Sequence, residues 1–135
     1  MSTLDNPKAL FQSTCSTNSE PYALQNIGNM MSPEFSENCI IIVDPGMPIH
    51  SEAYVIIDFN DELYFRQYVV ENNKKLLRCL NSSYDDINLT NDFDVRGCIT
   101  QQKQRKQKSL HYYLLDEENG EMKFSKKGKE KEINT

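Results

Sequence analysis

The stretch CIIIVDPGMPIHSEAYVIIDFNDELYFRQYVV, residues 39–70, decides the fold class. It holds three apolar segments rich in Val, Ile, Tyr and Phe. Turn residues separate them, because Pro45-Gly46 follows the first segment and Asn60-Asp61 follows the second. Short β-branched and aromatic segments between turn signals are typical of β-strands. The stretch therefore predicts three consecutive strands.

The same pattern continues on both sides of this stretch. YALQNI precedes it, KLLRCL and FDVRGCIT follow it, and polar turn residues such as NSSYDD separate the segments. No amphipathic segment of helical period and convincing length interrupts the series. Regularly spaced short strands are typical of sandwiches and barrels. The sequence predicts a mostly β, barrel-like domain.

Composition divides the chain into three parts. Residues 1–20 are rich in Ser, Thr and Asn and predict a flexible arm. Residues 21–102 contain the predicted strands and form the domain. Residues 103–135 predict a basic connector, a hairpin that turns at the Asn-Gly pair of DEENGE, and a disordered tail, SKKGKEKEINT. A short helix from Ser109 is the alternative to the hairpin.

The overall composition describes a polar, acidic chain. Its 135 residues are 38% hydrophobic and 26% charged, with a net charge of −5, and this length suits one domain. No apolar run reaches the roughly 18 residues of a transmembrane helix, so we expect no membrane partner. The four cysteines form no Cys-x-x-Cys pair, so we expect reduced, buried thiols in a cytoplasmic protein.

Charge is distributed unevenly along the chain. Residues 101–135 contain nine Lys or Arg and six Asp or Glu, which gives +3 and leaves −8 for residues 1–100. An acidic body is a poor surface for phosphate backbones. The cluster KQRKQK at residues 103–108 could contact nucleic acid, but a solvated connector is the favoured interpretation.

The turn NIGNMMSPEF, residues 26–35, lies between the first two predicted strands. Together with the order and spacing of the strands, it resembles the C-terminal domain of the LexA, lambda-type repressor and UmuD family of self-cleaving serine peptidases. In that family a Gly-Asp/Asn-Ser-Met-x-Pro turn carries the nucleophile. The corresponding turn positions here are Gly28, Asn29, Met31, Ser32 and Pro33. The resemblance covers residues 21–102 and includes IIIVDP, LNSSYDDI and VRGCI.

Both catalytic positions of this family are changed. The resemblance places Met30 at the serine nucleophile and Arg66 at the lysine base. A thioether offers no proton, and a guanidinium stays protonated at every working pH, whereas a buried lysine can lose its proton. Ser32 is a poor substitute, because Pro33 restricts its backbone and no lysine occupies the matching strand. The Ala-Gly or Cys-Gly bond that the family cleaves is also absent upstream of the turn.

The resemblance implies that Met30 and Arg66 lie near each other across a shallow groove. Arg66 then needs an acceptor, because an unpaired buried guanidinium is costly. The candidate acceptors are Glu34, Glu37 and backbone carbonyls. The plain alternative is that GNMMSP is only a turn of an unrelated β domain.

In the resembled family the last strand of the domain pairs with its copy across a two-fold axis. FDVRGCIT at residues 93–100 is the corresponding strand here, and strict alternation separates Cys98 from the face of Val95 and Ile99. The predicted dimer interface comprises Phe93, Val95, Arg96 and Ile99. A hairpin from Lys103 onward that covers this edge and leaves a monomer is the alternative.

The predicted function is a non-catalytic dimerisation domain of a transcriptional regulator, with a second copy as its partner. The alternatives are a UmuD-like accessory subunit of a DNA polymerase and a self-cleaving peptidase of altered mechanism. No helix-turn-helix pattern fits residues 1–20, so we expect no direct DNA binding by this chain, and a repressor or a polymerase is the further candidate partner. No cofactor is implied, and the solitary His50 and His111 predict no metal site.

Overall fold

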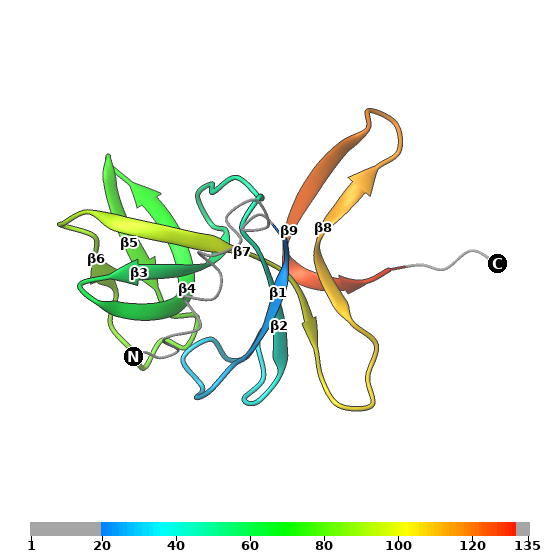
Figure 1. The fold of residues 1–135 in the computed structure, drawn as a ribbon, viewed down its shortest axis with the longest axis horizontal. Helices are drawn as coiled ribbons and strands as arrows, with labels where there is room; N and C mark the ends of the chain where they lie inside the picture. The colour runs from blue at the N-terminus through cyan, green and yellow to red at the C-terminus, as the bar shows by residue number, and fades with distance from the viewer. Residues whose placement is uncertain (1–19, 132–135) are drawn as a thin grey trace.

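The computed structural model describes residues 20–131, which form one curled antiparallel sheet without a helix (Figure 1). The strands in this range are β1 (Tyr22–Gln25), β2 (Ile40–Asp44), β3 (Tyr54–Phe59), β4 (Glu62–Glu71), β5 (Lys74–Arg78), β6 (Ile87–Asn88), β7 (Phe93–Lys103), β8 (Leu110–Asp116) and β9 (Glu121–Glu130). The mostly β, barrel-like fold that the sequence predicts is confirmed. Because residues 20–131 contain no helix, none in this range could cross a membrane. The predicted arm lies outside the described residues except for its last residue.

β7 joins the two halves of the sheet. The strand order is β1-β2-β7-β3-β4-β5-β6, and β8 pairs with both β7 and β9. From Phe93 to Cys98, β7 pairs with β3, whereas from Cys98 to Lys103 it pairs with β2. Figure 1 shows the long β7 crossing from the half that holds β3–β6 to the half that holds β1, β2, β8 and β9. The sheet curls at this strand because its two ends have different neighbours.

A bulge in β7 interrupts the alternation that the sequence predicts. Opposite β3, the register passes from Val95 directly to Gly97, so Arg96 is an extra residue. An extra residue moves the following side chains to the other face of the sheet. Cys98 therefore packs in the same cluster as Val95, whereas Ile99 packs in the opposite cluster. Strict alternation is wrong beyond Arg96, because it neglects this bulge.

The interior contains two hydrophobic clusters, which pack on opposite faces of β3 and β7. In the first cluster, the ring centroid of Phe35 lies 4.9 Å from that of Tyr54 and 5.0 Å from that of Tyr112. In the second cluster, Ile57 and Leu77 are fully buried. The buried free cysteines are Cys39, Cys79 and Cys98. Both faces of β7 are therefore in contact with core.

Strands β8 and β9 form a hairpin against the rest of the domain. The predicted hairpin is confirmed, and the helix from Ser109 is wrong, because residues 110–116 are a strand. β9 continues to Glu130, which corrects the expectation of a disordered tail from residue 125. The hydroxyl of Tyr54 donates to the carbonyl of Lys126 at 2.6 Å and helps to hold this segment on the domain. Residues 132–135 lie outside the described range.

Candidate functional site

The NIGNMMSPEF turn connects β1 to β2, and the loop at residues 80–84 holds it in place. The backbone amide of Asn81 donates to the carbonyl of Met30 at 3.0 Å, and its side chain donates to the carbonyl of Asn29 at 3.1 Å. The hydroxyl of Tyr84 donates to the side chain of Asn29 at 2.7 Å. The turn and the LNSSYDDI segment, which both contribute to the family resemblance, are therefore in direct contact.

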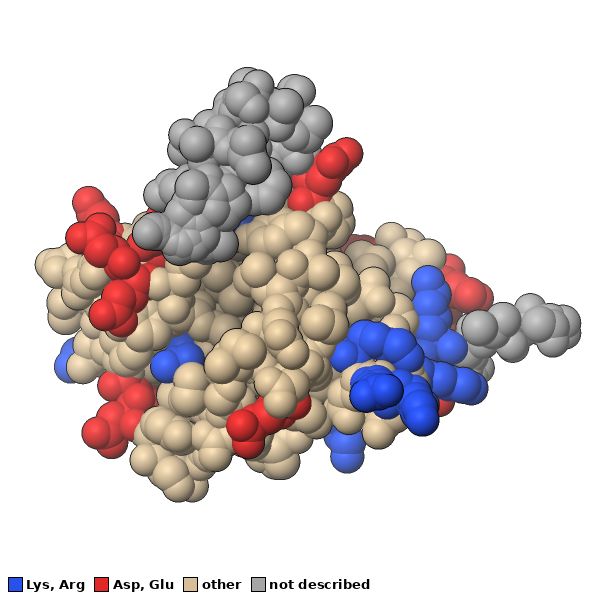
Figure 2. Space-filling view, turned by 60° about the horizontal axis from the view of Figure 1, so that its bottom comes forward, with Lys and Arg blue, Asp and Glu red and all other residues tan. Residues whose placement is uncertain are grey.

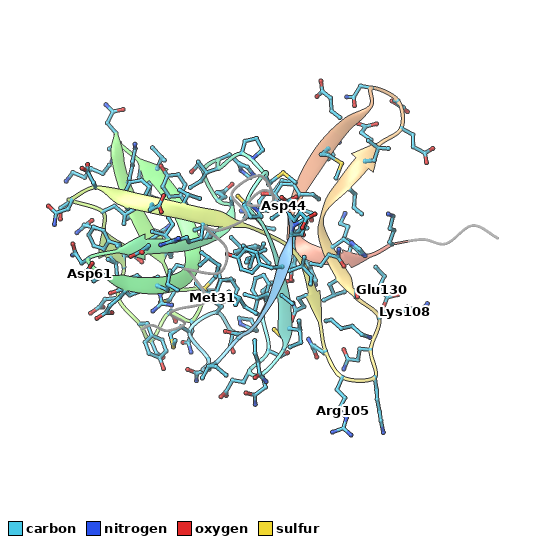
Figure 3. The ribbon with its side chains drawn as sticks, viewed as in Figure 1. Met31, Asp44, Asp61, Arg105, Lys108 and Glu130 are labelled. Carbon is cyan, nitrogen blue, oxygen red and sulfur yellow. The ribbon has the colours of Figure 1, made fainter. Side chains whose placement is uncertain are left out.

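The two adjacent methionines of the turn have different environments. Met31 is 1% exposed and points into the cluster around Phe35 (Figure 3). Met30 is half-buried and faces the surface. Gly28 opens the turn with a φ of +94°, and Ser32 and Pro33 follow in a cis peptide. The turn therefore anchors one methionine in the core and leaves the other at the protein surface.

Met30 and Arg66 line the same surface groove, which has a volume of about 370 Å³. Its walls come from β1, the NIGNMMSPEF turn and the first half of β4. Ile27 and Leu63, which are 67% and 49% exposed, add apolar surface to this groove. The structure thus brings together the two residues that the resemblance places at the catalytic positions.

The hydrogen-bond acceptor of the Arg66 guanidinium is a backbone carbonyl of the same strand. Its Nη1 donates to the carbonyl of Phe65 at 2.8 Å, and its guanidinium carbon lies 5.3 Å from the ring centroid of Tyr64. A backbone carbonyl is one of the predicted acceptors, whereas Glu34 instead accepts bonds from the C-terminal hairpin. The guanidinium also lies near Cys79, where burial raises the pKa of the thiol and Arg66 partly offsets that rise.

The lining of the groove differs from that of a serine-lysine site. Within the described part of the chain, its lining contains no serine, threonine, cysteine, lysine or histidine. Ser32 lies outside that lining, and its Oγ is directed at the carbonyl of Phe35, 3.5 Å away. A nucleophile must lie within about 3 Å of the base that takes its proton. Ser32 therefore stands apart from the groove that Met30 and Arg66 line.

The sequence does not reveal a buried hydrogen-bond network beside the turn. The carboxylate of Glu34 accepts from the hydroxyl of Tyr112 at 2.7 Å and from the amide of Gly128 at 2.8 Å. The side chain of Gln102 donates to the same hydroxyl and to the Glu34 carbonyl, both at 2.7 Å. Burial, and then the nearby Glu34, raise the pKa of Tyr112 far above its usual range. These bonds fasten the end of the turn to the C-terminal hairpin.

Comparisons with known proteins assign the chain to a family. Residues 2–100 match the family model described as Peptidase S24-like, which confirms the family resemblance of the sequence. The HTH-type transcriptional regulators for the conjugative elements R391 of Providencia rettgeri and SXT of Vibrio cholerae are each 31% identical to this chain over 67 residues. The match covers 48% of this chain and 31% of each regulator, so the chain spans about a third of these relatives. The chain therefore belongs to the Peptidase S24-like family.

Proposed function

We propose that this chain is a non-catalytic dimerisation domain of a transcriptional regulator, of the type found in LexA and phage repressors. The observation that carries the proposal is that one groove is lined by Met30 and Arg66, the residues that the family resemblance aligns with the serine and the lysine. The similarity to HTH-type regulators supports a repressor-like domain. In such a regulator the domain would pair two copies of a DNA-binding head, because paired heads are needed to span two half-sites.

The absence of peptidase activity can be tested with a fluorophosphonate probe, which labels activated serines. We expect no labelling of the unmodified chain, because Met30 has no hydroxyl and Arg66 cannot act as a base. We also expect an unchanged intact mass after incubation at alkaline pH. The double variant Met30→Ser with Arg66→Lys restores the residue types of the dyad, and we expect labelling at position 30.

The matched control for this experiment is Ser32→Ala in both backgrounds. This change should leave the labelling pattern unchanged, since the Ser32 hydroxyl is directed at a backbone carbonyl outside the groove. Labelling of the unmodified chain that disappears in Ser32→Ala would show an altered peptidase mechanism and would contradict the proposal. Loss of an N-terminal fragment at alkaline pH would contradict it as well.

The first half of β7 offers the surface for the proposed dimer. Residues 93–97 pair with β3 on one side, whereas β2 begins its pairing only at Cys98. The pairing of β8 with β7 is confined to Gln101 and Gln102. Among the described strands, none pairs with the second edge of residues 93–97. An unpaired strand edge is a template for pairing with another chain.

The side chains of the predicted interface differ in their accessibility. Phe93 and Val95 are half-buried, and Arg96 forms an ion pair with Asp58 of the same chain at 2.7 Å. Ile99 is 0% exposed and lies in the core of its own protomer. A substitution of Ile99 would therefore test the stability of the core. We assign the proposed interface to the edge of residues 93–97.

We expect a solution mass of twice the 15.7 kDa of one chain, measured by sedimentation equilibrium at micromolar concentration. An isologous antiparallel pairing about Val95 would place Asp94 opposite Arg96 of the second copy, twice per dimer. Asp94→Arg would place like charges there, and we expect its dimer dissociation constant to rise about tenfold. Asp92→Arg is the matched control, because it makes the same charge change outside the strand.

The outcomes of the mass measurement are distinct. A monomer mass for the unmodified chain would exclude dimerisation. Equal weakening by Asp92→Arg and Asp94→Arg would show that net charge, and not the edge of residues 93–97, controls association. Neither result would bear on the missing peptidase chemistry, which the labelling experiment tests separately.

A further inference from the structure

Basic side chains gather at the end of the molecule that holds β8 and β9. Figure 2 shows a compact group of Lys and Arg side chains on this end, with some acidic side chains beside it and others scattered over the rest of the surface in view. We call this group the basic face. Its members are Lys103, Arg105, Lys106, Lys108, Lys127, Lys129 and Lys131, and all are exposed.

The fold brings two separate segments together to form the basic face. β7 ends at Lys103 and β8 begins at Leu110, so residues 104–109 form the connecting loop. β9 then returns beside the start of β8, with Glu130 opposite Leu110 and Lys129 opposite His111. Figure 3 shows the side chain of Arg105 extending outward from the loop, at the same end of the hairpin as Lys108 and Glu130. The sequence reveals only the loop half of this surface.

The cations of the basic face form no ion pairs within the described part of the domain. Elsewhere in the described chain, Arg78 pairs with Glu71 and Asp86, Arg96 pairs with Asp58, and Lys126 pairs with Glu52. No member of the basic face forms an ion pair within 4 Å with any residue of the described range 20–131. Within residues 103–111 and 127–131, Glu130 is the one carboxylate.

This clustering differs from the charge of the molecule as a whole. The chain has a net charge of −5, yet seven of its 15 Lys and Arg residues lie on this one face. Like charges placed close together repel each other, and a bound polyanion relieves that repulsion. Four of the five acidic residues of the hairpin, Asp116, Glu117, Glu118 and Glu121, lie at its other end, around the turn at residues 117–120 (Figure 1). Most of the negative charge of the hairpin is therefore separated from the basic face.

We propose that the basic face binds the sugar-phosphate backbone of duplex nucleic acid without reading its sequence. Lysine and arginine supply the charge, and the exposed Gln107 side chain of the loop adds a hydrogen-bond donor of the kind that contacts phosphates. Single strands are usually held by aromatic stacking, but Tyr112 and Tyr113 of β8 are buried in the core. The cations and the lack of an exposed tyrosine in β8 therefore favour a duplex.

This inference goes beyond dimerisation and does not depend on it. The sequence pattern of residues 1–20 predicts no helix-turn-helix, and phosphate contacts need none, because they position a protein on DNA and carry no sequence information. In a regulator, such contacts would add affinity beside the site that a DNA-binding head reads. The basic face and the edge of residues 93–97 are different surfaces, so variants of one can leave the other intact.

The test is the salt dependence of binding to a fluorescent duplex of about 20 base pairs, followed by anisotropy between about 50 and 200 mM NaCl. Each phosphate contact contributes roughly −0.9 to the slope of log K against log salt concentration. We expect a linear fall for the full chain. For Arg105→Gln with Lys108→Gln, we expect a slope shallower by about 2 and a dissociation constant about tenfold higher near 100 mM NaCl.

Lys74→Gln with Lys123→Gln is the matched control, because it removes two exposed cations outside the basic face. We expect its dissociation constant to stay within about twofold of the unmodified value. An equal loss in this control, or no duplex binding at about 50 mM NaCl, would overturn the proposal. Tighter binding of polyglutamate of equal charge would overturn it in favour of an acidic protein partner. Tighter binding of a single strand would overturn the preference for a duplex.

Two further measurements identify the type of duplex and check that the variants stay folded and associated. Duplex DNA and duplex RNA of the same sequence distinguish the two sources of the phosphate backbone, and binding of either supports the proposal. The sedimentation mass and the thermal unfolding of both double variants should match those of the unmodified chain. Unchanged mass with lost duplex binding separates this proposal from that of dimerisation.

Discussion

Gly97→Ala is expected to lower the free energy of unfolding by about 3 to 5 kcal/mol. A Cβ atom at this position would lie 2.7 Å from Cγ1 of Val43 and 2.9 Å from the carbonyl carbon and oxygen of Asp44. The Asp44 carbonyl belongs to the backbone of the paired strand β2, so it cannot move aside as the end of a flexible side chain would. The φ of Gly97, +157°, is also rare for other residues.

The position of Gly97 explains why this loss should be large. It follows the extra residue Arg96 and lies where the pairing of β7 with β3 ends and its pairing with β2 begins. Displacing β2 there would disturb the packing of both hydrophobic clusters, because Val43 belongs to one and Cys98 to the other. A single added methyl group therefore acts on both halves of the domain.

Urea unfolding at fixed protein concentration measures this effect. Gly120→Ala is the matched control, because Gly120 also has a positive φ, +72°, but no atom lies within 4 Å of its added Cβ. We expect the control to lose only about 1 kcal/mol, which is the conformational part of the cost. Equal losses in the two variants would show that the contacts with Val43 and Asp44 do not determine the result.

The sequence predicts the strands well because their signals are local. The three apolar segments of residues 39–70 become β2, β3 and β4, and the turn residues between them fall in loops. The bulge at Arg96 has no comparable signal, because it is defined by the register of β7 against β3. That bulge places Ile99 in the cluster around Phe35, although unbroken alternation groups it with Val95, which packs against the other cluster. Long-range pairing therefore decides what local periodicity cannot.

In the candidate site, too, the sequence predicts some features, whereas long-range contacts determine others. The resemblance is sufficient to place Met30 and Arg66 beside one groove. It does not select among the candidate acceptors of Arg66, because Glu34 is held by Tyr112 and Gly128, 78 and 94 residues further along the chain. The ordered segment after residue 125 is missed for the same reason. Its sequence is polar, and its order depends on distant contacts, such as the bond from Tyr54 to the carbonyl of Lys126.

Stability is expected to fall as the pH rises above about 9, because the core contains acidic protons that the folded state retains. Burial raises the pKa of the Cys98 thiol from 9.0 to about 11. Burial also raises the pKa of Tyr54, Tyr112 and Tyr113 well above the usual 10.0. In the unfolded chain these groups lose their protons at about pH 9 to 10. The unfolded state then binds fewer protons than the folded state, and this difference lowers the free energy of unfolding.

The direction and the pH window follow from these shifts. The stability contributed by the protonated groups is fully present below about pH 9, and the Cys98 contribution is lost between about pH 9 and its folded pKa of about 11. Each buried tyrosine lowers the free energy of unfolding by on the order of 1 kcal/mol for every pH unit above about 10. With three such tyrosines, we expect a loss of several kcal/mol by about pH 11, which is comparable to the whole stability of a small domain.

Urea unfolding in the presence of reductant at several values between about pH 8 and 11 tests this expectation, and two phenylalanine variants locate its source. Tyr112→Phe should be less stable than the unmodified chain near pH 8, because Glu34 and Gln102 lose their hydroxyl partner. Its stability should nevertheless fall less steeply with pH, since one buried titrating group has been removed. Tyr84→Phe, at a 42% exposed position, should leave the steepness unchanged. A stability that stays constant up to about pH 11, or an equal flattening by both variants, would mean that the buried hydroxyls do not control alkaline unfolding.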